Sequence, residues 1–343
     1  MRPYQQETLN AIKEHFLTQN QARAKVIMAC DTGKSLLSIR TIDTLVDDRE
    51  ICVFFAPSLA LINQMLLEFF KESQSERYKV FAVCSDYSVG ANATNAIKES
   101  SEDVKASDIY IPVISSPSYL AKQVRHYQSK GKVIIFSTYQ SIDVIIQAQK
   151  IFQTPFKLII NDEAHRTAGA QKVDLEGNKK DISIWQKTHD NALINAKFRL
   201  YLTATPRIFN DKAKDKLKEK EITKDLLLFS MDDESIFGKE IYKLAFDRAI
   251  SLGILSDYRV LISFISENVV NSYLSKLSKA SGSNLSFETA GKMISLANAL
   301  KKKNIYFIDE NSKKEHDTSQ DEPMKRAVCF HSSIKTQLSS QGN

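Results

Sequence analysis

The stretch "KVIMACDTGKSLLSIRTIDTLV", residues 25–46, decides the fold. An apolar run at 25–29 leads into a polar loop that ends in Thr32-Gly33-Lys34-Ser35, and an amphipathic helical pattern follows. A strand, a loop and a helix in this order form a phosphate cradle, because backbone N–H groups and the helix N-terminus face the phosphates. In such a loop Lys34 reaches the terminal phosphates and the Ser35 hydroxyl is a ligand of Mg²⁺. These four residues predict a nucleoside triphosphate site.

The first two-thirds of the chain repeats the alternation of strand and helix. Further apolar runs lie at 51–57, 78–84, 132–138, 156–162 and 198–205, and helical patterns such as 59–73 separate several of them. Short runs of β-branched and aromatic residues are typical of strands buried on both faces of a parallel sheet. The alternation therefore predicts an α/β fold with a doubly wound, mainly parallel sheet.

With 343 residues the chain is long enough for two domains. We expect a first domain at 1–255, with a polar insertion at 85–130, and a second unit at 256–343. In the second unit the patterns predict a strand at 258–265, a helix at 288–303, a mobile polar loop at 309–325 and a strand at 326–332. The segment 211–225 holds six lysines against five acids, which favours a solvated helix over a DNA-binding one.

Composition indicates an ordinary soluble protein, with 43% hydrophobic and 26% charged residues. The four cysteines are isolated and no apolar run is long enough to cross a membrane, so we expect a reducing, cytoplasmic setting and no membrane partner. A net charge of +6 permits a nucleic-acid partner without establishing one. The scattered histidines predict no metal cluster, and we interpret Trp185 and His189 as packing and surface residues.

A second motif, "LIINDEAH" at 158–165, places two carboxylates after a buried strand, where α/β sheets bind ligands. In a nucleotide hydrolase Asp162 would hold Mg²⁺, largely through water, and Glu163 would position and activate the attacking water. His165 would pass the state of the site to a neighbouring element. An Asp-Glu pair alone would favour a charged turn, but its place behind an apolar strand and after a phosphate loop favours the catalytic interpretation.

A third motif, "YLTATPR" at 201–207, ends another apolar run in small hydroxyl residues. Thr203 and Thr205 can hydrogen-bond the carboxylates and couple hydrolysis to domain movement. Such a strand end is common, so this motif supports a nucleotide hydrolase only through its position after the DEAH motif.

The motifs occur in the order "RPYQ" (2–5), "MACDTGKS" (28–35), "APSLALINQ" (56–64), "FSTYQS" (136–141), "NDEAHR" (161–166) and "LTATPR" (202–207). This order resembles the first motor lobe of a superfamily 2 helicase of the DEAD/DEAH type. More narrowly, it is similar to the motor of type III and single-polypeptide type I-like restriction–modification enzymes. Residues 229–260 and 324–335 also look like that family, so the resemblance covers nearly the whole chain. It implies an ATP-dependent DNA helicase or translocase with a RecA-like first lobe and an incomplete second RecA-like lobe.

The resemblance also implies roles for the matching positions. Double-stranded DNA is the expected partner, although the motifs fit RNA as well, and contacts to its phosphates would be salt-sensitive and independent of sequence. For Tyr139 a packed core aromatic is an equal alternative. By family position, Arg2 and Gln5 would read the adenine of ATP, Thr32, Gly33, Lys34, Ser35, Asp162 and Glu163 would handle phosphates, Mg²⁺ and water, and Pro57, Ser58, Thr138, Tyr139 and Gln140 would line the nucleic-acid track.

The sequence departs from the family at Asp31, where the phosphate loop usually carries glycine. A carboxylate about 5 Å from a phosphate, at an effective dielectric near 20, costs roughly 3 kcal/mol, so we expect ATP binding to be weakened on the order of 100-fold.

The family also needs further motifs after the last strand, including an arginine worth roughly 10³–10⁵ in rate. We therefore expect a motor truncated within its second lobe and completed by another chain, such as a restriction or methylation subunit. The alternative is a non-hydrolysing DNA-binding remnant with a weakened nucleotide site. The sequence contains no methyltransferase motif, and Asp86 with 103–105 is a poor match to a nuclease.

Overall fold

The computed structural model describes residues 1–84, 109, 111–172, 183–209, 226–257, 265–281, 286–301, 306–308 and 315–317. The chain divides into two compact units, Met1–Ser256 and Asp257–Asn343. The predictions for 211–225, 258–264 and 326–332, and those for Asp86 and 103–105, lie outside the described residues.

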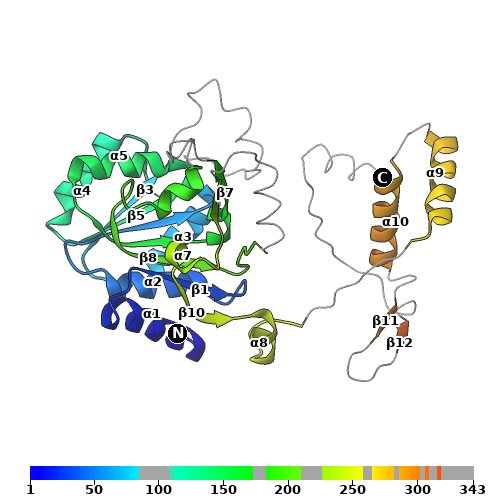
Figure 1. Ribbon diagram of the computed structural model, residues 1–343, viewed down its shortest axis with the longest axis horizontal. Coiled ribbons are helices and arrows are strands. Elements are labelled where there is room, and N and C mark those ends of the chain that lie inside the picture. Colours follow the sequence, from blue (N-terminus) through cyan, green and yellow to red (C-terminus); the bar gives the residue numbers. More distant parts are fainter. Residues whose placement is uncertain are drawn as a thin grey trace. The chain divides into compact units, whose positions relative to one another are not determined.

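The first unit is built on an eight-stranded sheet with the order β10-β1-β8-β6-β2-β5-β3-β4 (Figure 1). Every paired strand in it is parallel to its neighbour. All six predicted strands are present, so the doubly wound parallel fold is confirmed. The strands are β1 Arg23–Met28, β2 Ile51–Ala56, β3 Tyr78–Val83, β4 Val113–Ile114, β5 Lys132–Thr138, β6 Phe156–Asn161, β8 Ala196–Thr203 and β10 Lys239–Leu244.

Side-chain alternation along the strands divides the core into two layers. In β2, Cys52 and Phe54 belong to a cluster with α1, α2 and α3, whereas Val53 and Phe55 belong to a cluster with α4 and α5. Figure 1 shows α4 and α5 on one side of the sheet and α1 and α2 on the other. The helices are α1 Pro3–Lys13, α2 Lys34–Leu45, α3 Leu59–Glu72, α4 Pro117–Gln128, α5 Ile142–Phe152, α7 Glu234–Phe237 and α8 Phe246–Ser251.

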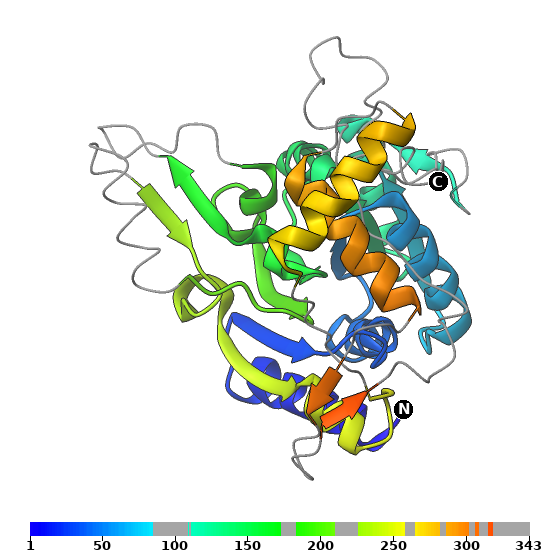
Figure 2. The same cartoon turned by 90° about the vertical axis from the view of Figure 1, so that its right-hand side faces the viewer.

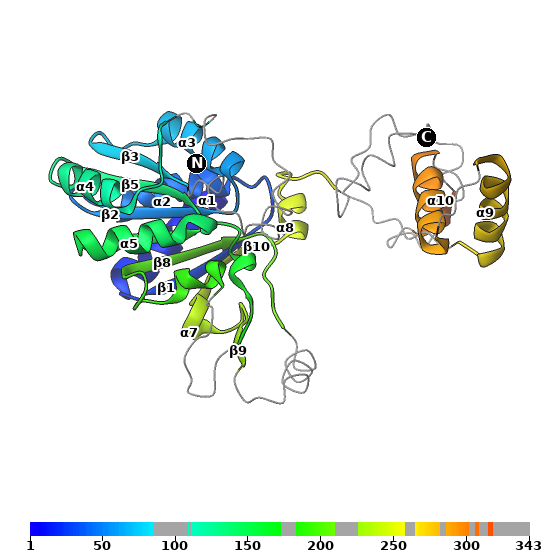
Figure 3. The same ribbon diagram turned by 90° about the horizontal axis from the view of Figure 1, so that it is seen from above.

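Short helical turns and a small antiparallel pair complete the first unit (Figure 3). The strands β7 Gly169–Lys172 and β9 Leu226–Phe229 pair antiparallel. Phe229 of β9 and Phe237 of α7 bury Tyr201 of β8 in a third apolar cluster. The turns are η1 Glu14–Thr18, η4 Tyr139–Ser141, η5 Ala164–Thr167 and η6 Ile184–His189, of which η1 is π-helical and the others are 3₁₀.

The prediction of a polar insertion at 85–130 is wrong for 113–128, which belongs to the main domain. Strand β4 pairs with β3 at the edge of the main sheet. Helix α4 buries Leu120, Ala121 and Val124 against the sheet. The sequence of α4 is mostly polar because only this narrow stripe faces the core, so its composition indicated an exposed segment.

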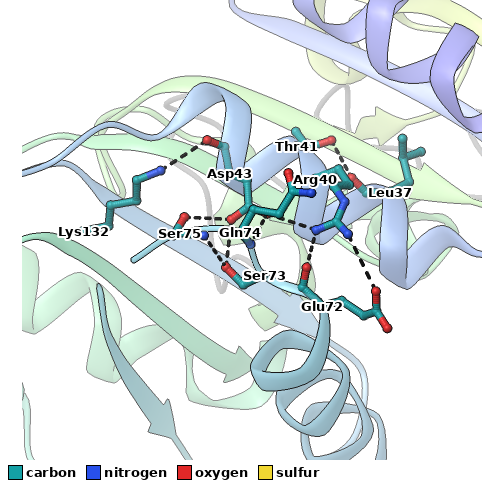
Figure 4. A network of polar contacts seen from close by, with 9 residues as sticks. All are labelled: Leu37, Arg40, Thr41, Asp43, Glu72, Ser73, Gln74, Ser75 and Lys132. Atoms are coloured by element: carbon teal, nitrogen blue, oxygen red, sulfur yellow. Dashed lines mark hydrogen bonds and ion pairs between the residues drawn. The ribbon is translucent and has the colours of Figure 1, made fainter. Parts of the chain in front are cut away.

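A polar network fixes α2 to the end of α3 (Figure 4). The carboxylate of Asp43 accepts hydrogen bonds from Ser73 Oγ at 2.8 Å, Ser75 Oγ at 2.7 Å and the Gln74 backbone N–H at 3.0 Å. Arg40 forms an ion pair with the same carboxylate at 3.3 Å. Lys132 Nζ at the start of β5 donates to the Asp43 carbonyl at 3.2 Å. The network therefore joins two helices and a strand at the amino-terminal edge of the sheet.

The second unit contains α9 Glu267–Ser281, α10 Phe287–Lys301 and the antiparallel pair of β11 Tyr306–Ile308 with β12 Glu315–Asp317. Figure 2 shows α9 and α10 packed side by side. Helix α10 confirms the helix predicted at 288–303. Strand β12 lies within the predicted mobile loop 309–325, so that prediction is wrong at 315–317. Among the described residues, no helix is long and apolar enough to cross a membrane.

Candidate nucleotide site at the carboxyl edge of the sheet

Five neighbouring strands bring the predicted motifs to one edge of the sheet. In the order β1, β8, β6, β2 and β5, each strand ends within or directly before a motif. Because parallel strands have their carboxyl ends at the same edge, the phosphate loop, the Thr203 segment, the DEAH residues, Pro57 and Tyr139 all gather there. The edge therefore holds every predicted site residue that follows a strand.

The loop between β1 and α2 adopts the backbone of a phosphate cradle. Gly33, directly before α2, has a φ of +84°, and Asp31 has a φ of +58°. Aspartate tolerates this left-handed region better than most residues, so Asp31 replaces glycine without breaking the loop. The Thr32 hydroxyl donates to the Ala29 carbonyl at 2.7 Å. Lys34 Nζ makes two long contacts of 3.4 Å with the carbonyls of Met28 and Ala29, which phosphate oxygens can replace.

Residues of α1 hold this loop from the side. Tyr4 Oη donates to the Thr32 carbonyl at 2.9 Å, and Gln5 Nε2 donates to the same carbonyl at 3.3 Å. Gln5 Oε1 accepts from the Arg2 backbone N–H at 2.8 Å. A Cβ atom added to Gly33 would lie 2.3 Å from Gln5 Nε2, so the glycine permits the close approach. The structure thus brings Gln5, which accepts the Arg2 N–H, to the loop, while the contact of both residues with adenine stays a prediction.

Asp162 lies at the end of β6 with its backbone anchored on both sides. Its N–H donates to the Phe55 carbonyl at 2.9 Å, and its carbonyl accepts from Tyr139 Oη at 2.8 Å. Burial and then the charge of Glu163 raise the pKa of Asp162 to about 6, while Lys34 acts in the opposite direction. Its Oδ1 atom is buried and has no hydrogen-bond partner among the described residues. A buried carboxylate oxygen of this kind fits a bound cation.

Glu163 has a strained backbone conformation, and its carboxylate is paired with His165. Its φ of +47° and ψ of +46° lie in the left-handed region, which residues other than glycine adopt mainly where the surroundings enforce it. Its carboxylate lies 3.3 Å from His165 Nδ1, and this hydrogen bond lowers the pKa of Glu163. Lys34 lowers that pKa further, so the lysine and both carboxylates share one electrostatic site.

His165 links the carboxylates to β8. Its Nδ1 atom also lies 3.0 Å from Thr203 Oγ1, which in turn accepts the Thr205 backbone N–H at 3.2 Å. The sequence predicted direct contacts between the threonines and the carboxylates. Instead, Thr203 reaches Glu163 through His165, and Thr205 has an exposed side chain.

The donor set fits magnesium. Mg²⁺ commonly binds one or two protein ligands together with phosphates and water. Asp162 offers its buried Oδ1, and the half-buried Ser35 is the second residue of α2. The residues that the structure describes contain no cluster of three or more His, Cys, Asp or Glu side chains that could hold a metal without a nucleotide. Asp162 and Ser35 match the one or two protein ligands that Mg²⁺ takes beside phosphates and water.

The residues predicted for a nucleic-acid track lie at the same edge of the sheet, but only some of their side chains are accessible to a ligand. Ser58 is half-buried and caps α3 by accepting the Leu61 N–H at 3.3 Å. Gln140 is half-buried and donates to the carbonyl of the buried Pro57 at 3.4 Å. The Thr138 side chain is 4% exposed and its hydroxyl pairs with Ser141 at 2.9 Å.

Tyr139 is fully buried. Its ring stacks on Phe55 at 5.5 Å and packs on Trp185 at 4.9 Å between centroids. The structure thus places Tyr139 in the core, which was the alternative left open, and removes it from the surface of the track.

His189 corrects a second prediction. It is 6% exposed rather than a surface residue, and it packs among the rings of Tyr201, Phe229 and Phe237. Its Nδ1 lies 3.0 Å from Tyr201 Oη. The sequence around His189 does not indicate this burial, because Phe229, which covers it, lies on β9 and is distant in sequence. Tyr4, by contrast, holds the phosphate loop and lies within the "RPYQ" motif, a signal that could have identified it.

A phosphate loop, a DEAH box and a threonine-bearing strand at one edge of a parallel sheet define the first lobe of a superfamily 2 helicase motor. Residues 1–208 match the family described as "Type III restriction enzyme, res subunit", and the chain belongs to this family.

Two solved structures of restriction–modification enzymes are similar to the chain. The ATP-dependent Type ISP restriction-modification enzyme LlaBIII bound to DNA has 29% identity and a TM-score of 0.68 over 89% of this chain. A nuclease-deletion mutant of the Type ISP enzyme LlaGI in complex with a DNA substrate mimic has 28% identity and a TM-score of 0.57 over 86% of this chain. The chain spans only 19% and 23% of those two proteins. A comparison with curated proteins finds no match.

Proposed function

We propose that the chain is an ATP-dependent DNA translocase or helicase motor module of a restriction–modification-type system. The observation that carries the proposal is the convergence of Lys34, Asp162 and Glu163 at one sheet edge, with a buried carboxylate oxygen that has no partner in the described protein. The match of residues 1–208 to a restriction-enzyme family supports the same conclusion.

Each of the three residues has a task in ATP hydrolysis. Lys34 would leave the loop carbonyls and bind the terminal phosphates. Asp162, with Ser35, would hold Mg²⁺, which when bound neutralises charge on the phosphates. Glu163, whose pKa is lowered by His165, stays ionised at neutral pH and can accept a proton from the attacking water. Through their contact, His165 and Thr203 would transmit a change in the position or charge of Glu163 to β8.

Double-stranded DNA is the proposed partner, bound along the ends of β2 and β5. The two similar enzymes were solved with DNA or a DNA mimic, which supports this choice over RNA. Ser58 and Gln140 are half-buried at these strand ends and can donate hydrogen bonds to phosphates. A restriction or methylation subunit as a further partner is part of the proposal.

A second candidate function follows from Asp31. Its carboxylate lies in the phosphate loop and is exposed there, so it opposes a polyphosphate. In this alternative the chain binds DNA through the same edge but hydrolyses no nucleotide.

Phosphate release separates the two candidates. The chain would be assayed with Mg²⁺ and ATP, without nucleic acid, with duplex DNA or with duplex RNA, and with candidate partner chains added. We expect duplex DNA to stimulate release, and Lys34→Ala and Glu163→Gln to remove it. Glu68→Gln, at a half-buried position of α3 whose carboxylate accepts a hydrogen bond from Gln64, is the matched control and should retain it. DNA binding without phosphate release under every condition would favour the second candidate, and absence of both would refute the proposal.

A further inference from the structure

We propose that Tyr139 is a positioning residue that holds the peptide between Asp162 and Glu163 and transmits nucleic-acid binding at the end of β5 to these carboxylates. The inference rests on the proposed function and assigns to Tyr139 a role other than direct contact with DNA.

The first observation is where the Tyr139 hydroxyl binds. It donates to the Asp162 carbonyl at 2.8 Å, and this carbonyl belongs to the peptide that joins Asp162 to Glu163. The orientation of that peptide sets the φ angle of Glu163, which is +47°. A glutamate in the left-handed region needs support from its surroundings. The Tyr139 hydroxyl supplies such support at the peptide itself.

The second observation is that the ring of Tyr139 has no freedom to move alone. It stacks on Phe55, whose carbonyl accepts the Asp162 N–H at 2.9 Å, so the same two residues hold both polar groups of the Asp162 backbone. On its other side the ring packs on Trp185, whose own ring lies 5.9 Å from the Arg166 guanidinium. Since Tyr139 is fully buried, its hydroxyl moves only when its backbone or this stack moves.

The third observation is where the backbone of Tyr139 lies. It begins the turn η4 directly after β5, between Thr138 and Gln140. Gln140 in turn donates to the Pro57 carbonyl at the end of β2 at 3.4 Å. A polyanion bound at these strand ends would therefore act on the backbone that carries Tyr139. A shift of that backbone reaches the Asp162–Glu163 peptide through one hydrogen bond.

The test compares two buried tyrosines that each lose only a hydroxyl. Tyr139→Phe removes the bond to Asp162, and Tyr201→Phe is the matched control. Tyr201 is also fully buried, and its hydroxyl contacts Arg23 at 3.1 Å and His189 at 3.0 Å instead of the DEAH peptide. Trp185 is the single tryptophan of the chain and packs on Tyr139, so its fluorescence reports binding without requiring hydrolysis.

The measured quantity is the affinity for Mg²⁺ with a non-hydrolysable ATP analogue, in the presence and absence of duplex DNA. The ratio of the two affinities is the coupling between the sites. We expect coupling of about tenfold in the wild type, a change comparable to the net effect of one hydrogen bond. The coupling should fall below about twofold in Tyr139→Phe and persist in Tyr201→Phe, while DNA affinity without nucleotide stays the same in all three.

Three results would overturn the inference. The coupling could be unchanged in Tyr139→Phe, it could fall equally in both variants, or Tyr139→Phe could lose DNA affinity in the absence of nucleotide. The first excludes the transmission, the second indicates a general packing effect, and the third indicates a direct contact. A wild-type chain that binds neither nucleotide nor DNA would instead refute the proposed function, which distinguishes the two failures.

Discussion

Replacing Asp31 tests how the phosphate loop of this chain handles charge. At about 5 Å from a phosphate, one unit charge is worth roughly 3 kcal/mol at an effective dielectric of 20 and roughly 0.8 kcal/mol in water. The structure places the Asp31 side chain in solvent, which moves the interaction toward the lower value. We therefore expect Asp31→Gly to bind ATP about tenfold more tightly, less than the 100-fold that the sequence alone suggested.

A second substitution separates charge from backbone strain. Asn also tolerates the φ of +58° found at this position, so Asp31→Asn removes the charge while keeping the backbone preference. If electrostatic repulsion dominates, both variants gain affinity equally, and the gain shrinks as salt is raised from 50 to 500 mM because ions screen exposed charges.

Binding of ATP with Mg²⁺ would be measured by titration calorimetry, with urea unfolding as the control for stability. Equal ATP affinities for the wild type and both variants would refute the electrostatic reasoning. A gain in Asp31→Gly alone would assign the effect to the backbone, since glycine adopts left-handed dihedrals without a steric cost.

Three further predictions concern stability and pH. Gly33→Ala should cost about 1 kcal/mol more unfolding free energy than Gly253→Ala in urea titrations: both have positive φ, but only the Cβ at Gly33 would displace a neighbour, the Gln5 amide 2.3 Å away, and break its hydrogen bond to the Thr32 carbonyl. Asp43→Ala should cost about 2–4 kcal/mol by the same measurement because it leaves the hydroxyls of the α2–α3 network without their acceptor, whereas Asp48→Ala, which loses an exposed ion pair, should cost less than about 1 kcal/mol. Asp162→Asn should stabilise the chain in EDTA: the pKa of Asp162 is raised from 3.8 to about 6, so its ionisation opposes folding as pH rises through this window, and the gain should grow to about 3 kcal/mol by pH 6.5 and then level off. An equal effect of Asp162→Asn at pH 4 and pH 8 would contradict the last prediction.

The parts of the fold that the sequence predicted are those with continuous apolar runs. All six predicted strands lie in the interior of the sheet or next to its edge and are buried almost throughout. The edge strand β10 of the main sheet was missed because it lacks this signal. In β10, "KEIYKL", only Leu244 is buried, because the strand lies at the edge beside β1. Strand β4 has only two residues, too few for a recognisable pattern, and α4 buries only a narrow apolar stripe.

The residues of the site were predictable from the sequence, whereas their contact partners were not. The phosphate loop, the DEAH residues and their order identified the chemistry, because those residue types serve phosphates and a metal on any parallel sheet. The partners of these residues did not follow from the motifs. Gln5 holds the loop, Thr203 contacts His165, and Tyr139 binds the backbone of Asp162. Each of these contacts joins segments more than twenty residues apart, so no local pattern contains it.

The sequence by itself determined that a parallel α/β lobe with a nucleotide-binding edge would form, because buried strands and phosphate loops have local signatures. Only the tertiary structure decided that β6 lies between β8 and β2, so that His165 contacts the Thr203 hydroxyl on one side and the Asp162 N–H donates to the Phe55 carbonyl on the other. The physical reason is that strand order is set by the packing of both sheet faces against helices and loops distant in the chain. The same packing turned Tyr139 inward and left Asp31 in solvent.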